Sequence, residues 1–114
     1  MPVTIYHNPR CSKSRQTLTL IQEKGIAPEI IEYLKSPPSE SELDQILSKL
    51  AVKPEALMRK GEDEFKLHFM GKNLSRTESI HLMVQYPKVI ERPIVINGNK
   101  AIIGRPPECV LDIL

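Results

Sequence analysis

The sequence predicts an α/β protein in which an all-helical section at residues 36–87 interrupts a four-stranded mixed sheet. Three observations support this. Residues 3–34 read as strand, helix and strand within the length of a βαβ unit. Residues 36–87 carry apolar side chains at helical spacing, bounded by serines and prolines. Residues 93–114 contain two short strands around an Asn-Gly turn, followed by a terminal helix.

The first strand, at residues 3–6, alternates apolar and polar side chains, and a turn at residues 8–9 leads into a helix that ends at Gly25. Cys11 therefore lies at or near a helix N-terminus. Unpaired backbone N–H groups and the positive end of the helix dipole stabilise a thiolate there. A tetrahedral oxyanion would bind the same donors. The alternative is a polar turn whose cysteine only caps the helix.

Three side chains near Cys11 are candidates to support its thiolate. His7 would act as an imidazolium or through the hydrogen-bonded turn, and a structural role is an equal alternative. Ser14 would donate a hydrogen bond to the thiolate or cap the helix, two roles that are compatible. Arg15 adds a positive charge close in sequence.

A second strand at residues 29–34 completes the βαβ unit, so it is expected to run parallel to the first. The character of the chain changes after Ser36-Pro37-Pro38. Two capping-box patterns, beginning at Ser39 and Ser75, each start a helix in the section that follows. The helical segments of this section are predicted at residues 39–50, 54–60, 62–69 and 75–86.

Strand patterns return at residues 93–96 and 100–103, and the turn between them predicts an antiparallel hairpin. A short helix follows over residues 109–114, where we expect Cys109 to pack in the core. A parallel pair and a hairpin together give a small thioredoxin-like sheet of four strands. The sulfur of Cys11 would lie at the end of the first strand, where open α/β sheets usually bind ligands.

Arginines are the second chemical signal. Arg92 precedes the first strand of the hairpin and Arg105 follows the second, so the hairpin would bring both side chains near Cys11. Arg59 ends a short helix in the helical section. Guanidinium groups match tetrahedral oxyanions and keep their charge at any working pH. The alternative for each is a solvated surface arginine.

Composition excludes several classes of function. With 16 basic and 14 acidic residues, the net charge of +2 gives no general case for nucleic-acid binding. The sequence lacks a signal peptide and an apolar run long enough to span a membrane, so we expect a cytoplasmic protein that binds no membrane. Cys11 and Cys109 form no Cys-x-x-Cys pair, and three scattered histidines complete no metal site.

Four separated motifs occur in order through nearly the whole chain, and together they resemble the glutaredoxin-dependent arsenate reductase family (ArsC). The motifs are His7-Asn8-Pro9-x-Cys11-x-x-Ser14-Arg15, Ala56-Leu57-Met58-Arg59-Lys60, Glu91-Arg92-Pro93-Ile94-Val95 and Arg105-Pro106-x-Glu108-x-Val110-Leu111-Asp112-Ile113-Leu114.

The resemblance implies a thioredoxin-like fold with an inserted helical section. A length of 114 residues predicts a single domain over residues 1–114, and we expect a monomer. It implies that Cys11 attacks arsenate to form a covalent sulfur–arsenic adduct, which glutathione and glutaredoxin then reduce. Glutathione would be a co-substrate, with no cofactor bound. Arg59, Arg92 and Arg105 would bind the arsenic oxyanion, and His7 would be linked to activation of the thiolate.

The sequence leaves rival functions open. The chain stops without the C-terminal extension typical of active family members, which leads us to ask whether it completes the reaction. A thiol-redox enzyme of the same fold could act on another substrate. A regulator like the Spx branch, which contacts RNA polymerase, often has a second cysteine where this chain has Ser14. Phosphatase-like arsenate reductases need Cys-x5-Arg, whereas Arg15 follows Cys11 after three residues.

Overall fold

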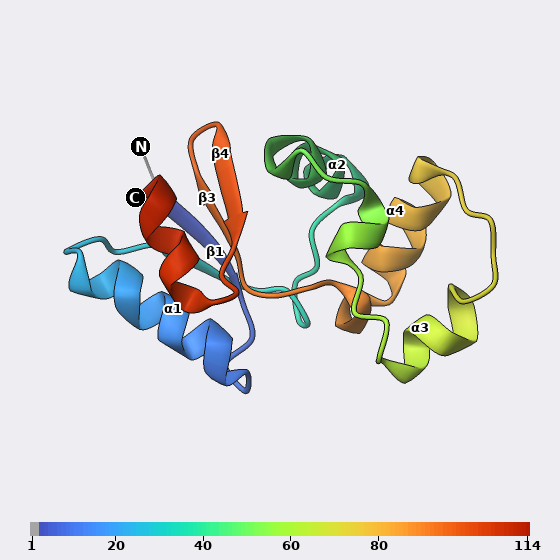
Figure 1. Cartoon of the computed structure of the whole chain (residues 1–114), viewed down its shortest axis with the longest axis horizontal. Coiled ribbons are helices and arrows are strands. Elements are labelled where there is room, and N and C mark those ends of the chain that lie inside the picture. The colour runs from blue at the N-terminus through green and yellow to red at the C-terminus, as the bar shows by residue number, and fades with distance from the viewer. Residues whose placement is uncertain (1–2) are drawn as a thin grey trace. The chain divides into compact units, whose positions relative to one another are not determined.

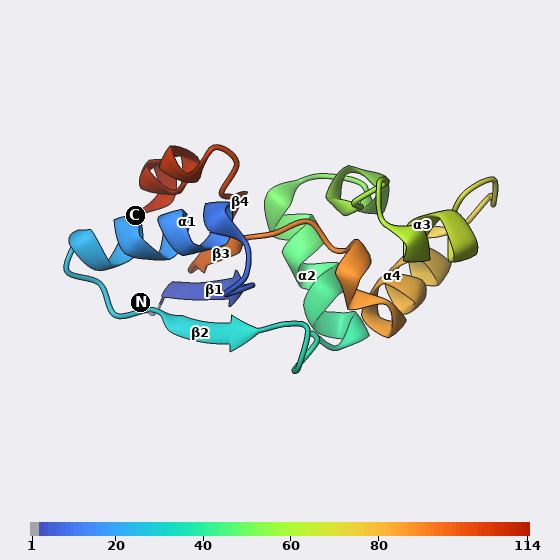
Figure 2. The same ribbon diagram turned by 90° about the horizontal axis from the view of Figure 1, so that it is seen from below.

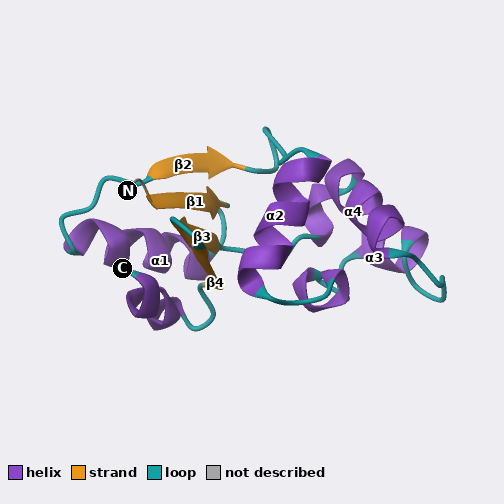
Figure 3. Ribbon diagram, turned by 90° about the horizontal axis from the view of Figure 1, so that it is seen from above, coloured by secondary structure: helices purple, strands orange, loops and turns teal. Residues whose placement is uncertain are grey.

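A computed structural model describes residues 3–114, which form two compact units (Figure 1). The sheet unit comprises the residues up to Ser36 together with Arg92–Leu114, and the helical unit comprises Pro37–Glu91. Figure 3 shows that the strands of the described chain belong to the sheet unit, whereas the helical unit contains helices and loops. The predicted separation of strand and helix patterns along the sequence therefore matches the structure.

The sheet has the predicted mixed topology. Its strand order is β2-β1-β3-β4; β1 pairs in parallel with β2 and antiparallel with β3, and β3 and β4 form the antiparallel hairpin. The strand bounds are Val3–His7 for β1, Glu29–Glu32 for β2, Ile94–Asn97 for β3 and Lys100–Ile103 for β4. A parallel pair and an antiparallel hairpin in one sheet, with helices beside it, give the predicted α/β fold.

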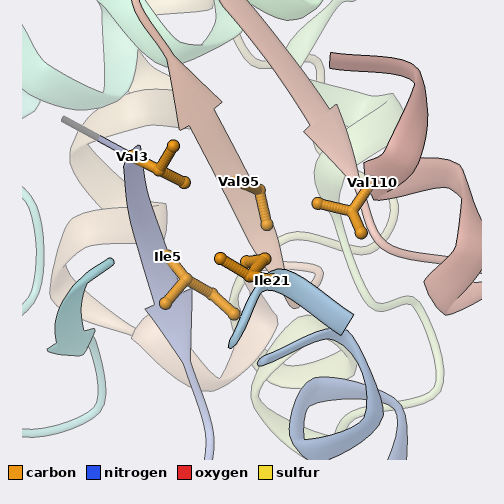
Figure 4. Packing of buried hydrophobic residues seen from close by; sticks show 5 residues of the cluster. All are labelled: Val3, Ile5, Ile21, Val95 and Val110. Carbon is orange, nitrogen blue, oxygen red and sulfur yellow. The ribbon is translucent and has the colours of Figure 1, made fainter. Parts of the chain in front are cut away.

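One face of the sheet carries the core of this unit. Helix α1 (Ser12–Glu23) and the 3-10 helix η3 (Pro107–Ile113) contact each other on that face (Figure 2). Ile5 of β1 is in register with Val95 of β3, so alternate residues of both strands point to the same side. Figure 4 shows how the buried side chains from the strands and both helices meet: Val3, Ile5, Ile21, Val95 and Val110.

The terminal helix differs from its prediction in type and in what it buries. It begins at Pro107 and is a 3-10 helix, in which side chains three positions apart lie above one another. Pro107 and Val110 are buried on this spacing, whereas Cys109 is partly exposed. The expectation that Cys109 packs in the core is therefore wrong, because the three-residue period turns it to the side.

Two serines start the longer helices of the helical unit, as predicted. Ser39 Oγ accepts a hydrogen bond from the backbone N–H of Glu42 at 3.1 Å, and Glu42 Oε1 accepts one from the backbone N–H of Ser39 at 2.9 Å. Ser75 forms the same capping box. The elements are α2 (Glu40–Leu50), η1 (Pro54–Leu57), α3 (Asp63–His68), α4 (Arg76–Gln85) and η2 (Pro87–Val89).

The helical unit reaches slightly beyond the predicted residue 87 because η2 adds a further turn after α4. An isolated bridge between Met58 and Ile90 joins its last residues to the segment after η1. Among residues 3–114, no helix has the length and apolar character needed to cross a lipid bilayer.

Candidate active site

Cys11 is the N-cap of α1, where the sequence predicts a helix N-terminus. Its backbone is extended (φ −93°, ψ 122°), and α1 begins at the next residue. The N–H of Cys11 donates to Asn8 O at 3.0 Å, which closes the turn after β1. Its carbonyl accepts the N–H of Arg15 at 3.0 Å, which is an early hydrogen bond of the helix. The end of β1 and the start of α1 thus fix the position of the sulfur.

Several groups around Cys11 act on its pKa. Partial burial opposes ionisation and is the largest single influence. The backbone N–H of Ser14, the charge of Arg92, the backbone N–H of Lys13 and the charge of Arg105 all favour the anion, and their sum sets the pKa of the thiol below its ordinary value. The local prediction of an acidified thiol thus agrees with the geometry.

The hairpin brings Arg92 and Arg105 together, as the sequence suggests. Arg105 Nη2 lies 3.8 Å from Cys11 Sγ, although 94 positions separate the two residues. Arg105 Nε donates to the carbonyl oxygen of Arg92 at 2.9 Å, so the same guanidinium is anchored to the chain. One edge of the planar group is therefore held by backbone while another nitrogen faces the sulfur.

The contact partner of His7 is Ser14. His7 and Ser14 are both buried, and His7 Nδ1 lies 2.6 Å from Ser14 Oγ. Ser14 Oγ also accepts the N–H of Asn8 at 3.0 Å. Burial lowers the pKa of His7; Glu32 partly offsets this shift and Arg15 adds to it. A neutral ring that braces the turn is thus favoured over an imidazolium.

The two remaining predicted arginines have other partners. Arg15 Nη1 donates to Pro9 O at 2.9 Å and so holds the turn before Cys11. Arg59 belongs to the helical unit, where Arg59 Nη1 lies 2.6 Å from Glu62 Oε1 in an ion pair. The backbone N–H of Arg59 also donates to Val89 O at 2.7 Å, so the residue is well anchored in that unit.

Sequence reasoning gave no role to Gly104, which directly precedes Arg105. A Cβ atom on Gly104 would lie 2.6 Å from Thr17 Oγ1 and 2.9 Å from Pro93 Cγ. Its N–H donates to Pro93 O at 2.9 Å. Only glycine permits so close an approach between the end of β4, α1 and Pro93. The sequence does show that Gly104 lies between a predicted strand and the candidate site residue Arg105, and this position could have indicated a need for glycine.

The chemistry of this arrangement follows from its charges. An acidified thiol is a nucleophile, and the nearby guanidinium groups can hold the oxygen atoms of an anion while the sulfur attacks it. Among residues 3–114, no group of three or more His, Cys, Asp or Glu side chains could hold a metal ion. The lowered pKa of Cys11 and the approach of Arg105 to its sulfur suit nucleophilic attack by sulfur on an oxyanion.

Comparison with known proteins identifies the family. The family model described as "ArsC family" matches residues 6–113. The chain belongs to the ArsC family. Three of the family motifs meet in the sheet unit: Arg105 approaches Cys11 and donates a hydrogen bond to the backbone of Arg92, and the charge of Arg92 acts on the thiol.

Related ArsC proteins match over the full chain. It is 48% identical to a protein of Haemophilus influenzae named arsenate reductase, with complete coverage of both chains. It is 40% identical to an arsenate reductase of Escherichia coli, covering 98% of this chain and 80% of that protein. The solved structure titled arsenate reductase from Vibrio cholerae has a TM-score of 0.96 and 46% identity, and the match covers 100% of this chain and 98% of that one.

Proposed function

We propose that this protein is an arsenate reductase, which converts arsenate to arsenite through an adduct on Cys11. The observation that carries the proposal is the position of Arg105 Nη2, 3.8 Å from the sulfur of a thiol with lowered pKa. Its membership of the ArsC family and its similarity to proteins named arsenate reductase support arsenate as the substrate. Arsenate is thus the oxyanion that we propose for the site beside Cys11.

The first step is substitution at arsenic(V). The Cys11 thiolate attacks, a bond forms between Sγ and arsenic, and one arsenate hydroxyl leaves as water after taking one proton from solvent. The lowered pKa of Cys11 raises the thiolate fraction, and so the supply of the nucleophile, relative to an ordinary cysteine at the same pH. Arg92 and Arg105 hold the negative charge of the remaining arsenate oxygens during this step.

The second stage needs two electrons from outside the chain, because Ser14 stands where a resolving cysteine would be. Glutathione condenses at the arsenic and releases a second water. A glutaredoxin thiolate then attacks the glutathione sulfur and forms a glutaredoxin–glutathione mixed disulfide. The electron pair of the broken S–As bond stays on arsenic and reduces it to arsenic(III), while the two thiols are oxidised. Water displaces Sγ, which leaves arsenite and regenerates the Cys11 thiol. Glutathione is thus a co-substrate and glutaredoxin a partner.

The supporting residues have distinct roles in this proposal. Ser14 and His7 brace the turn, and Arg15 holds it through Pro9 O. Arg59 is given an oxyanion-binding role on the family resemblance alone. We further propose that the protein works as a monomer in the cytoplasm, where glutathione keeps thiols reduced.

The role of Arg59 has a direct test within the helical unit. Arg59→Ala should lower kcat/KM for arsenate by about 10²-fold if the residue binds the oxyanion. Arg76→Ala is the matched control, since Arg76 is likewise ion-paired, to Asp44 at 2.9 Å. Equal kinetics in the two variants would remove Arg59 from the site.

Arsenite production tests the function itself. Purified protein with arsenate, glutathione and glutaredoxin should form arsenite, and omission of either thiol component should stop multiple turnover. Intact-mass spectrometry of the protein with arsenate alone should show an adduct that maps to Cys11. Absence of both turnover and adduct would overturn the proposal and leave a thiol-redox reaction on another substrate as the alternative.

A further inference from the structure

We propose that a groove between α1 and η3, beside Cys11, binds glutathione, the peptide thiol of the proposed reaction; this inference rests on the proposed function. The α1–η3 groove has a volume of about 410 Å³. Its lining consists of Ser12, Arg15, Gln16, Thr19 and Leu20 from α1, with Pro107 and Glu108 from η3.

The position of the groove suits a reagent that must reach the sulfur. One wall begins at Ser12, the residue after Cys11, and continues along the first turns of α1. The other wall begins at Pro107, two residues after Arg105, whose Nη2 approaches Cys11 Sγ to 3.8 Å. Both walls are therefore direct continuations of the segments that carry the nucleophile and its cation. A tripeptide in the groove would have its thiol close to the segment that carries the arsenic adduct.

The charges of the lining suit a zwitterionic peptide. Arg15 on one wall offers a guanidinium, of which one nitrogen is anchored on Pro9 O at 2.9 Å. Its remaining N–H donors suit a ligand carboxylate. Glu108 on the other wall suits an ammonium group. Glutathione carries carboxylates at both ends, an ammonium at one end and its thiol between them, so it can satisfy both walls at once.

The remaining lining adds selectivity against simpler ligands. Ser12, Gln16 and Thr19 offer polar groups for the peptide amides, and Leu20 and Pro107 give an apolar floor. A free oxyanion would gain Arg15 but meet the like charge of Glu108. A small neutral thiol would use neither charge. The lining therefore favours a ligand that carries both signs of charge along a short peptide.

A second hollow near the same turn fits less well. It is lined by residues that include Arg10, Glu32 and Lys35, and its volume is about 280 Å³. The α1–η3 groove is the roomier of the two, and its walls continue from the segments that carry Cys11 and Arg105, so we prefer the groove.

Titration with S-methylglutathione, whose blocked sulfur cannot react, tests the site directly. In ¹⁵N-labelled protein, we expect amide shifts concentrated on Ser12, Gln16, Thr19 and Glu108. Shifts confined to the hollow around Arg10 and Lys35, or no saturable shifts at millimolar ligand, would overturn the proposal. Binding of glutaredoxin alone to these amides, without binding of the tripeptide, would also overturn it.

A charge reversal measures the contribution of Glu108. Glu108→Lys should lower the affinity for S-methylglutathione at least about tenfold, because a lysine ammonium would repel the ammonium group of the ligand that the Glu108 carboxylate attracts. Glu23→Lys makes the same change on exposed α1 outside the groove and should leave affinity unchanged. Equal affinity in both variants would contradict the assignment. The ¹⁵N spectra of the variants report whether each remains folded.

Kinetics separates this inference from the proposed function. In Glu108→Lys the KM for glutathione should rise about tenfold while the KM for arsenate stays unchanged. With dithiothreitol, which lacks both charges, the variant and the unmodified protein should match. The arsenate adduct on Cys11 forms before any external thiol acts. Loss of that adduct would defeat the proposed function, whereas tripeptide binding elsewhere would defeat only the groove.

Discussion

Helix α1 of the sheet unit and helices α2 and α4 of the helical unit begin in opposite ways. Helices α2 and α4 each start with a serine and a glutamate that close a capping box, with acidic side chains in the first turn. Helix α1 starts with Cys11 and carries Lys13 and Arg15 in its first turn, with no acid there. The capped helices satisfy their own N-termini, whereas the start of α1 keeps its positive end for a sulfur anion and its ligand.

This difference shows that the unpaired N–H groups at the start of a helix can be capped by local side chains, which stabilises the fold, or can remain available to bind a functional anion. A local carboxylate at α1 would neutralise the N-terminus and repel an oxyanion. The polar side chains in the first turn of α1 form hydrogen bonds with the preceding turn instead of capping the helix. Ser14 bonds His7 and the backbone N–H of Asn8, and Arg15 donates to the carbonyl oxygen of Pro9. The following predictions test this contrast in order of expected effect.

Replacing the nucleophile should have the largest effect. Cys11→Ser should lower arsenate turnover by at least about 10³-fold, because the hydroxyl is far less nucleophilic than a thiolate. Cys109→Ser is the matched control, and its turnover should stay within about twofold of the unmodified protein. Arsenite formation with glutathione and glutaredoxin measures both. Equal losses would indicate that a disulfide relay joins the two cysteines.

Exchanging Arg105 for lysine should cost about 10²-fold in kcat/KM for arsenate. A lysine keeps the charge but has one nitrogen, so it cannot both donate to Arg92 O and approach Cys11 Sγ. Steady-state kinetics at saturating glutathione measures the loss. Arg76→Lys, in the helical unit, is the control. Unchanged kinetics in Arg105→Lys would show that charge alone is needed.

An acidic residue in the first turn of α1 should give its N-terminus a negative charge, as in α2 and α4, and so disfavour the Cys11 thiolate. Because the pKa of Cys11 lies below that of an ordinary cysteine thiol, its alkylation by iodoacetamide should reach half its maximal rate at a lower pH than that of an unperturbed cysteine in a short peptide. Lys13→Glu should move this midpoint to higher pH, since a carboxylate disfavours the thiolate. A Cys109→Ser background restricts labelling to Cys11. Lys24→Glu, at the other end of α1, should leave the midpoint in place.

Gly104→Ala should destabilise the protein by about 1–3 kcal/mol, because the new methyl overlaps Thr17 and Pro93. The same change at Gly61 is the control in the helical unit. A Cβ on Gly61 would meet no heavy atom of the described chain within 4 Å. Urea unfolding should therefore show a loss for the first variant and little change, or a small gain, for the second. Equal stability would contradict the close packing at Gly104.

Removing one capping box should have the smallest effect. Ser75→Ala should lower the free energy of unfolding by about 1 kcal/mol, because the N–H of Glu78 loses its acceptor. The pH midpoint of Cys11 alkylation should not change. A shift of that midpoint would show that the capped helices also contribute to the acidity of the thiol.

The features that sequence predicts well are the local ones. A capping box joins two residues three positions apart, and the hairpin joins neighbouring strands, so each leaves a recognisable pattern in the sequence. Cys11 at a helix start is local in the same sense. The mixed sheet could be predicted because a helix joins β1 to β2 and a tight turn joins β3 to β4, so the first pair is expected to be parallel and the second antiparallel.

The features that sequence leaves open or misses depend on distant contacts. The sequence predicts that Arg105 lies near Cys11, but the 3.8 Å approach of Nη2 to Sγ depends on the register of three strands, which no local pattern sets. The need for Gly104 becomes visible only when Thr17 and Pro93 lie beside it. His7 was open to two roles because its partner, Ser14, is seven positions away and becomes buried only in the folded turn.

The pairing of His7 with Ser14 gives the turn a natural spectroscopic reporter. Because Ser14 engages Nδ1 and burial favours the neutral ring, the ring nitrogens should adopt one tautomer whose ¹⁵N shifts differ from those of a free imidazole. The His7 ring is hydrogen-bonded to Ser14 of the turn and not to the sulfur of Cys11. Selective labelling of His7 would therefore follow strain in the turn during each stage of the cycle while the reactive thiol stays unmodified by a probe.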